Sequence, residues 1–232
     1  MKYKLFTMVI IASLAVFGTY NANATEPKKV EYSTPDGAVL KGTLRGGGNT
    51  MVILSHQNRA SQKQWTFFAE QLANMGYSTF TYSFRGFGDS PGSIDTTTTV
   101  DDLRGTVQYL KNEGSTKFVL ISASMGSNAT VKVASELKTL ANVIMAPYYG
   151  GSKFAGAGWD DVKKITSPTF FLTSSFDSSK KHAERMYSQV AGVKKIKVFS
   201  GNDHGVKLLT GEHKKECEKL ILDFLATHAP VK

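Results

Sequence analysis

An apolar run leads directly into a serine, and this junction constrains the fold more than any other part of the chain. Residues 117–122 predict a buried strand that ends in Ser122-Ala-Ser124-Met-Gly126, and residues 127–139 then favour a helix. A strand that turns sharply into a helix at a serine needs small side chains two positions before and two positions after it. Ser122, where glycine is usual, and Gly126 meet this need. The junction is typical of a nucleophile elbow with Ser124 at its tip.

Strand and helix patterns alternate along the chain. A hairpin is expected first, with strands at 30–33 and 38–44 joined by the turn sequence Thr34-Pro-Asp-Gly37. Further strands are expected at 51–55, 78–83, 117–122, 142–146, 169–174 and 195–199. Helices are expected at 65–75, 100–111, 127–139, 179–190 and 213–227. Such alternation predicts an α/β fold: a mostly parallel sheet of about eight strands, covered on both faces, with an antiparallel hairpin at one edge.

A serine hydroxyl becomes an effective nucleophile when a base accepts its proton, and that base is usually a histidine oriented by an acid. Asp177 follows one predicted strand, and His204 follows the next within Gly201-Asn-Asp-His-Gly205. Ser124, Asp177 and His204 therefore have the chain order of one class of catalytic triad, at the strand ends where open α/β sheets place their sites. Asp203 is the alternative acid. The side chain next to a histidine in the sequence rarely points at the imidazole of that histidine. Asp177 is therefore favoured over Asp203.

With these residues the chain resembles the α/β-hydrolase fold family, and within it the capless serine hydrolases similar to dienelactone hydrolases and small esterases. The resemblance runs from about Val30 to the C-terminus. Residues 51–56 resemble the family's strand ending in His-Gly, with Gln57 in the glycine position. Residues 82–90 resemble its Asp-X-Arg-Gly-X-Gly-X-Ser segment, with Ser83 where aspartate is usual. These two differences leave the substrate class more open than the fold.

The resemblance also implies an oxyanion hole, in which backbone amides bind the negative charge that develops on the substrate oxygen. One is the amide of Met125, after the elbow serine, and the other is the amide of Asn58. The side-chain amide of Gln57 is a further candidate. In the family, the histidine at the position of His56 braces this loop, and the arginine at the position of Arg85 belongs to a structural turn.

Residues 147–159 lie between two predicted strands and are rich in aromatic residues and glycine. Members of the resembled family with lids insert a helical domain here, so the short connection implies an open site without a separate lid domain. Tyr148, Tyr149, Phe154 and Trp159 are candidates to line a substrate pocket at the strand ends. Alternatively, these rings only pack the loop against the sheet.

The N-terminus has the features of a secretory signal peptide. Lys2 and Lys4 precede the apolar stretch 5–17, and Ala22-Asn-Ala24 provides small residues for cleavage. The apolar stretch is shorter than the roughly 20 residues of a membrane-spanning helix. We expect removal of residues 1–24, and export of residues 25–232 as a single domain to the periplasm or the medium. The chain has 41% hydrophobic residues, enough for one core of its own.

Charge and cysteine content limit the partners. The formal net charge is +9, and removing residues 1–24, with two lysines and no acids, leaves +7. Lysine pairs are scattered over different elements, which argues against a nucleic-acid site and leaves a weak association with anionic envelope surfaces open. The single Cys217 forms no internal disulfide. The five histidines lack metal-binding spacing, so we expect neither a metal nor a cofactor.

Together these features predict an exported serine hydrolase that cleaves small or medium carboxylic esters through an acyl-enzyme. A serine peptidase or amidase with the same residues is an alternative. A catalytically weak binding protein of this fold is another, because a fold does not guarantee an activity. The sequence indicates neither the substrate itself nor the oligomeric state.

Overall fold

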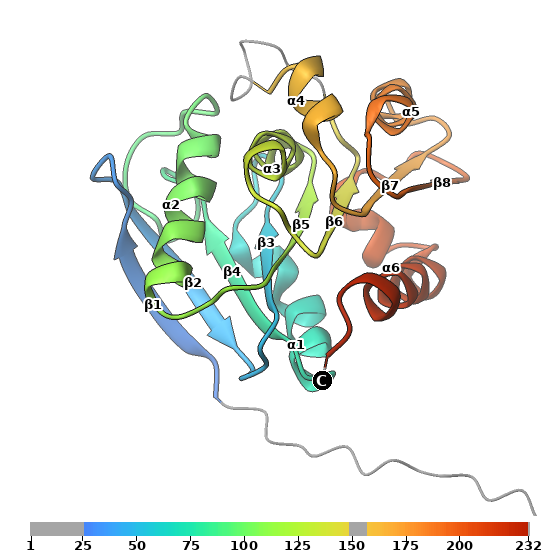
Figure 1. The fold of residues 1–232 in the computed structure, drawn as a ribbon. Coiled ribbons are helices and arrows are strands. Elements are labelled where there is room, and N and C mark those ends of the chain that lie inside the picture. The colour runs from blue at the N-terminus through green and yellow to red at the C-terminus, as the bar shows by residue number, and fades with distance from the viewer. Residues whose placement is uncertain (1–25, 149–156, 232) are drawn as a thin grey trace, which may run out of the picture.

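Parallel strands form the centre of the molecule. The computed structural model describes residues 26–148 and 157–231, and these contain one eight-stranded sheet with the order β1-β2-β4-β3-β5-β6-β7-β8 (Figure 1). The strands are β1 Lys28–Ser33, β2 Val39–Arg45, β3 Met51–Ser55, β4 Ser78–Ser83, β5 Phe118–Ala123, β6 Ala141–Met145, β7 Thr169–Ser174 and β8 Lys194–Phe199. β1 and β2 form an antiparallel hairpin, β2 pairs antiparallel with β4, and the other pairings are parallel. The predicted fold class is confirmed.

Helices cover both faces of this sheet (Figure 1). They are α1 Thr66–Asn74, α2 Thr99–Asn112, α3 Met125–Glu136, α4 Trp159–Lys164, α5 Lys180–Gln189 and α6 Lys214–His228, with 3-10 turns η1 Gln62–Trp65 and η3 Gly205–Leu209. One core lies between the sheet and α2 to α5, and a second between the sheet and α1 and α6. Because successive strand residues point to opposite faces, Ile53 of β3 belongs to the first core, whereas Val52 and Leu54 belong to the second.

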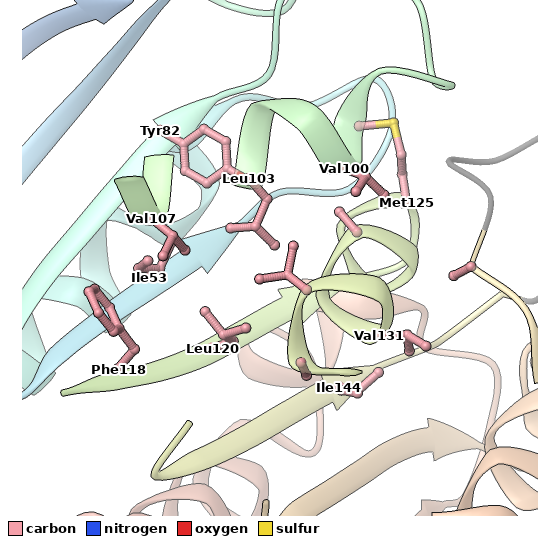
Figure 2. Close-up of a cluster of buried hydrophobic side chains, with 14 of the residues drawn as sticks. Ile53, Tyr82, Val100, Leu103, Val107, Phe118, Leu120, Met125, Val131 and Ile144 are labelled. Atoms are coloured by element: carbon pink, nitrogen blue, oxygen red, sulfur yellow. The ribbon is translucent and has the colours of Figure 1, made fainter. Parts of the chain in front are cut away.

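The first core shows how the helices are held over the strands. Figure 2 shows side chains of β3, β5 and β6 facing those of α2 and α3. Leu120 and Ile144 come from the strands, and Leu103 and Val107 from α2. All four side chains are at least 95% buried. Full burial of one aliphatic side chain contributes roughly 1.5–3 kcal/mol to stability.

Every predicted helix is present with boundaries shifted by one to three residues, and the largest differences from the prediction are at α3 and α4. α3 ends at Glu136, three residues earlier than expected, because the backbone N–H of Thr139 bonds to Ser167 Oγ instead of continuing the helix. α4 was not predicted, since six residues are too few for a helical pattern. It begins where the Asp161 carboxylate accepts the N–H of Gly158, which satisfies one of the unpaired amides of a helix start.

The strand ends that are adjacent in the sheet bring the predicted site residues to one edge. Ser55 of β3 lies opposite Ser122 of β5, and Ala123 of β5 lies opposite Met145 of β6. The loops that follow β3, β5, β6, β7 and β8 therefore start side by side. Within the described part of the chain, no helix has the length and apolarity needed to cross a membrane. Residues 1–24, Tyr149 and Phe154 lie outside the described residues, and so do the expectations that concern them.

Candidate active site

Ser124 occupies a strained turn between β5 and α3. Its backbone has φ 50° and ψ −111°, a conformation that residues with a Cβ rarely adopt. All six residues of β5 are buried, whereas Ser124 itself is half-buried. Its N–H donates to the carbonyl of Met145 at 2.9 Å, which anchors the turn to β6. A held outlier of this kind costs about 1–3 kcal/mol and is typical of functional sites.

The glycine that follows the elbow is needed for close packing. A Cβ at Gly126 would lie 2.7 Å from the carbonyl oxygen of Ser55 and 2.8 Å from that of His56. Both distances are shorter than real Cβ contacts, so a larger residue would push the helix away from β3. Ser122, two residues before the elbow serine, is completely buried. The small residues of the sequence motif therefore allow the elbow to sit against the end of β3.

His204 and Asp177 form a direct hydrogen bond. His204 Nδ1 lies 2.7 Å from Asp177 Oδ2, although the two residues come from different loops, after β8 and β7. The Asp177 side chain is 5% exposed, and its other oxygen accepts the N–H of Ser179 at 2.6 Å. An ionised carboxylate accepts only, so Nδ1 carries the proton and Nε2 is left as the acceptor.

Asp203 points elsewhere. Its carboxylate pairs with Lys207 at 3.1 Å, and its backbone carbonyl accepts a hydrogen bond from Ser174 Oγ at 2.7 Å. Among the described residues, Asp177 is the acid that contacts His204, as the sequence prediction favours.

The loop that carries His204 also packs against the elbow strand. A Cβ at Gly205 would lie 3.4 Å from Cβ of Ala123, the residue that precedes Ser124. No hydrogen bond between Ser124 Oγ and His204 Nε2 is present in the described part of the structure. Catalytic hydrogen bonds are often longer without substrate and shorten in the complex. The loop after β8 therefore lies against the residue that precedes Ser124, and it carries His204, which contacts Asp177.

His56 is buried and has a partner at each ring nitrogen. Its Nδ1–H donates to the carbonyl of Gln57 at 2.7 Å, and its Nε2 accepts the N–H of Phe84 at 3.0 Å. Burial lowers the pKa of this imidazole to about 4, although the bond to Gln57 opposes the shift. A neutral ring with both nitrogens occupied does not move protons in a reaction. This arrangement fixes the loop after β3, the role that the family resemblance implies.

The amides expected to form the oxyanion hole lie at the ends of β3 and β5. Met125 is the first residue of α3, where backbone N–H groups have no partner within the helix. Asn58 is exposed, and its side-chain oxygen accepts the N–H of Arg59. The backbone N–H of Gln57 donates to the side-chain oxygen of Gln64 at 3.0 Å, with the Gln64 amide oriented so that its oxygen also accepts from Trp65. The side-chain amide of Gln57 remains a further candidate donor beside the backbone amides of Met125 and Asn58.

A hollow of about 420 Å³ adjoins Asp177. Its described lining consists of Tyr148, Asp177, Ser178, Lys180, Lys181 and Glu184. Two larger hollows, of about 550 and 680 Å³, lie along the β1–β2 hairpin and are lined by none of Ser124, Asp177 and His204. Trp159 lies under the guanidinium of Arg185, 3.8 Å from its ring centroid, and packs against the first core. Of the aromatic candidates described, Tyr148 lines the hollow.

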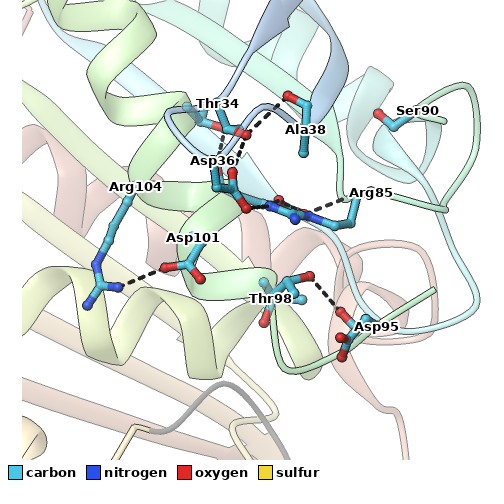
Figure 3. Close-up of polar contacts among 12 residues, drawn as sticks. Thr34, Asp36, Ala38, Arg85, Ser90, Asp95, Thr98, Asp101 and Arg104 are labelled. Carbon is cyan, nitrogen blue, oxygen red and sulfur yellow. Dashed lines mark hydrogen bonds and ion pairs between the residues drawn. The ribbon is translucent and has the colours of Figure 1, made fainter. Parts of the chain in front are cut away.

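Arg85 lies just after β4 and connects this strand end to the β1–β2 turn and to α2. Its Nε donates to the buried carboxylate of Asp102 at 2.6 Å, and its Nη2 contacts Asp36 at 2.9 Å. Its backbone N–H also donates to Asp102, and Figure 3 shows the arginine beside the turn that contains Thr34 and Asp36. These contacts make Arg85 part of a structural turn.

Known proteins show the same architecture. A family described as "Serine aminopeptidase, S33" matches residues 49–156, a region that contains Ser124 but neither Asp177 nor His204. The esterase Pf2001 of Pyrococcus furiosus shares 21% identity, covers 88% of this chain and 93% of its own, and superposes with a TM-score of 0.75. The chain has the α/β-hydrolase fold. Through the matched family it is a serine hydrolase of this fold, which confirms the predicted enzyme class.

Other solved α/β-hydrolase structures are similar at lower identity. An esterase of Exiguobacterium antarcticum shares 17% identity, with 85% of this chain and 99% of that chain covered and a TM-score of 0.68. A hydrolase of Pseudomonas aeruginosa shares 15% identity, with 88% and 99% covered and a TM-score of 0.73. No curated protein matches the sequence. The particular likeness to dienelactone hydrolases stays a prediction.

Metal binding and thiol chemistry both depend on where the His, Cys, Asp and Glu side chains lie. Across residues 26–148 and 157–231, no group of three or more His, Cys, Asp and Glu side chains is placed to hold a metal ion. Cys217 is completely buried in α6, and burial raises the pKa of its thiol to about 12. A thiol of that kind is not a nucleophile near neutral pH.

The sequence interpretation overlooked the contacts of Gln57. Its side-chain oxygen accepts the N–H of Val206 at 3.2 Å, on the loop that carries His204. Gln57 was considered only as a donor to the oxyanion. Its position in place of the family's glycine was the available signal, because a long polar side chain there must find partners on a neighbouring loop.

Proposed function

We propose that this α/β-hydrolase is an exported serine esterase acting on small or medium carboxylic esters. The observation that carries the proposal is the bond between His204 and Asp177 on loops beside the strained elbow at Ser124. A serine held in a costly backbone conformation, next to a histidine oriented by a buried acid, is the arrangement that activates a hydroxyl.

The proposed reaction proceeds through an acyl-enzyme. Ser124 Oγ forms a bond to the ester carbonyl carbon, and its proton passes to His204 Nε2. Asp177 holds the imidazole in the required tautomer and stabilises its positive charge. The negative charge on the carbonyl oxygen is bound by the amides of Met125 and Asn58. The bond to the alcohol oxygen then breaks, and His204 gives its proton to that oxygen.

Water completes the cycle. His204 Nε2 takes a proton from water, whose oxygen attacks the acyl carbon, and the Ser124 ester bond breaks with return of the proton to Oγ. The acid product leaves and the enzyme is restored. Removing one oxyanion donor from a serine protease of another fold costs about 2.7–4 kcal/mol of activation free energy.

The size of the expected substrate follows from the surroundings of the triad. The hollow beside Asp177 has about 420 Å³ and includes Tyr148, which we propose contacts the substrate. Residues 146–158 separate β6 from α4, too few for a lid domain. Without a large apolar lid to shield a lipid surface, an open site suits short or medium acyl chains rather than long-chain lipids. Two of the similar solved structures are described as esterases, which supports the ester assignment.

A serine peptidase or amidase is the second candidate, favoured by the family match to serine aminopeptidases. The same triad serves both reactions. A binding protein without activity is the third candidate. Covalent labelling of Ser124 by a fluorophosphonate contradicts it, and a folded chain that is not labelled supports it.

The first test is covalent labelling of the mature chain with a fluorophosphonate probe, followed by intact-mass measurement beside Ser124→Ala. One probe per chain, absent from the variant, supports an activated serine and leads to matched panels of p-nitrophenyl esters and aminoacyl p-nitroanilides. Faster turnover of the esters supports the first candidate, and faster turnover of the anilides the second. A folded but unlabelled chain refutes both.

Export is a separate part of the proposal, supported by Lys2, Lys4, the apolar stretch 5–17 and Ala22-Asn-Ala24. N-terminal sequencing of the protein recovered outside the cytoplasm is expected to begin at Thr25. A chain that keeps Met1 in the cytoplasm contradicts it. The net charge of +7 after cleavage also supports a weak association with anionic envelope surfaces, which salt-dependent sedimentation with envelope fragments tests.

A further inference from the structure

We propose that Gln57 is a positioning residue that holds the His204 turn in place relative to the oxyanion loop. The inference rests on the proposed function for the role of His204, and on contacts of Gln57 that stand independently of it. Gln57 replaces a glycine of the resembled family, so its role is particular to chains with a long polar side chain here.

The central contact joins two loops that are far apart in the sequence. Gln57 Oε1 accepts the backbone N–H of Val206 at 3.2 Å. Val206 is the second residue of η3 and is 5% exposed. The first N–H groups of a helical turn have no partner within it, and a buried N–H without a partner destabilises the fold. Gln57 therefore supplies the acceptor that the start of η3 requires, two residues after His204.

Gly205 lets this side chain approach the turn. Its φ is 58°, and a Cβ at this position would lie 2.3 Å from Gln57 Oε1. On its other side the same Cβ would lie 3.4 Å from Ala123 Cβ, next to the elbow serine. The turn is thus enclosed between Gln57 and the end of β5, with only a glycine fitting between them.

The backbone of Gln57 is itself held on both sides, at its N–H and at its carbonyl. Its N–H donates to the side-chain oxygen of Gln64, and that oxygen also accepts from Trp65 Nε1 at 3.3 Å. Its carbonyl accepts from His56 Nδ1 at 2.7 Å. His56 and Trp65 are completely buried. The side chain of Gln57 therefore extends from a rigid base to the turn of His204.

This connection complements the bond to Asp177. The His204 side chain is 38% exposed, and Asp177 fixes the orientation of its ring through Nδ1. That bond alone does not fix the backbone from which the ring projects. A displacement of about 1 Å between reacting groups lowers rates by about a hundredfold. Gln57 connects the turn of His204, the proposed base, to the loop whose Asn58 amide is proposed to bind the oxyanion. The distance between the base and the oxyanion site is therefore held constant.

The experiment compares two substitutions of similar length in the full mature chain. Gln57→Met removes the acceptor, and Gln57→Glu keeps an acceptor and adds a negative charge. Gln108→Met is the matched control, because Gln108 is exposed on α2, away from the site. Activity is read as the rate of fluorophosphonate labelling and as kcat and KM for a p-nitrophenyl ester. Hydrogen exchange of the Val206 amide reports the contact without any activity.

For Gln57→Met we expect faster Val206 exchange and a kcat lowered about ten- to a hundredfold with little change of KM. For Gln57→Glu we expect Val206 to stay protected and most of kcat to be kept. The acid limb of its pH profile should move to higher pH, because the added carboxylate favours the protonated imidazole. Asp177 and the Asp203–Lys207 pair, the charged groups around this turn, are unchanged in both variants.

The failures are distinguishable. Unchanged Val206 exchange in Gln57→Met overturns the inference whatever the activity. Faster exchange with wild-type kcat shows a contact without a positioning role and overturns it as well. A wild-type chain that is not labelled refutes the proposed function, and with it the positioning role, irrespective of the variants.

Discussion

Asp177 Oδ2 lies 2.7 Å from His204 Nδ1, while Asp203, the immediate neighbour of His204, pairs with Lys207. The acid that orients the imidazole therefore comes from the loop after β7, one strand away in the sheet. Asp203 is next to His204 in the sequence, but the Asp203 side chain points to Lys207.

Asp177→Asn should lower kcat roughly 10³- to 10⁴-fold, because an amide no longer holds Nδ1 protonated and stabilises no imidazolium. KM should change little. The matched control is Asp203→Asn, which removes a partly exposed pair with Lys207 and should leave kcat close to that of the wild type. Steady-state kinetics on one ester check both. A larger loss in Asp203→Asn than in Asp177→Asn would reverse the assignment.

Ser124→Gly should make the protein more stable while abolishing labelling. The backbone of Ser124 at φ 50° and ψ −111° is strained for a residue with a Cβ and accessible to glycine. We expect a gain of roughly 1–2 kcal/mol in the free energy of unfolding, measured in urea. Ser124→Ala keeps the Cβ and should gain nothing comparable. Equal stability of the two variants would show that the elbow stores no backbone strain.

His56 should make stability depend on pH. Burial lowers its pKa to about 4, below the value of about 6.5 in the unfolded chain. As the pH falls, the unfolded chain binds the proton first. The stability due to neutral His56 is therefore complete above about pH 6.5 and is lost between pH 6.5 and 4, by about 3 kcal/mol in all.

The measurement for His56 is the difference in unfolding free energy between the wild type and His56→Gln at pH 7 and at pH 4.5. Other titrating groups cancel in this difference. At pH 7 the variant should be less stable by about 1–3 kcal/mol, since the N–H of Phe84 or the carbonyl of Gln57 loses its partner. At pH 4.5 the difference should be smaller. A difference that is constant over this range contradicts the buried neutral imidazole.

Arg85→Leu should destabilise the fold by about 3–5 kcal/mol, because it leaves the completely buried carboxylate of Asp102 without its partner. Arg104→Leu is the control, since Arg104 also joins two acids, Asp101 and Glu136, but on the surface. Figure 3 shows its contact with Asp101. An exposed pair contributes about 0–1 kcal/mol. Urea unfolding of both variants checks the contrast, and similar losses would show that burial does not decide the strength of these pairs.

Sequence patterns predicted most of the sheet because its central strands are rich in apolar, aromatic and β-branched residues. β3, β4, β5, β6 and β7 consist only of buried residues, so burial and strand length appear directly in the sequence. α4 escaped prediction because a six-residue helix carries too little periodicity. Its stability comes from tertiary contacts, such as the pair between Asp161 and Lys132 of α3.

The loops around the site were less predictable, because their side-chain directions depend on distant partners. The ring of Trp159, a candidate for the substrate pocket, lies under the guanidinium of Arg185 of α5. The side-chain oxygen of Gln57, whose amide is a candidate oxyanion donor, accepts the N–H of Val206, 149 residues further along the chain. No local pattern contains such contacts.

The sequence by itself determined the order of strands and helices, the elbow at Ser124 and the chain order of the serine, the acid and the histidine. These properties follow from local hydrophobic periodicity and from the small residues that a tight turn requires. The tertiary structure alone decided that Asp177 and not Asp203 contacts His204, that His56 is neutral, and that Gln57 reaches the His204 turn. Each of these depends on how loops from separate strands pack at one edge of the sheet, where burial and partner distance set both charge and orientation.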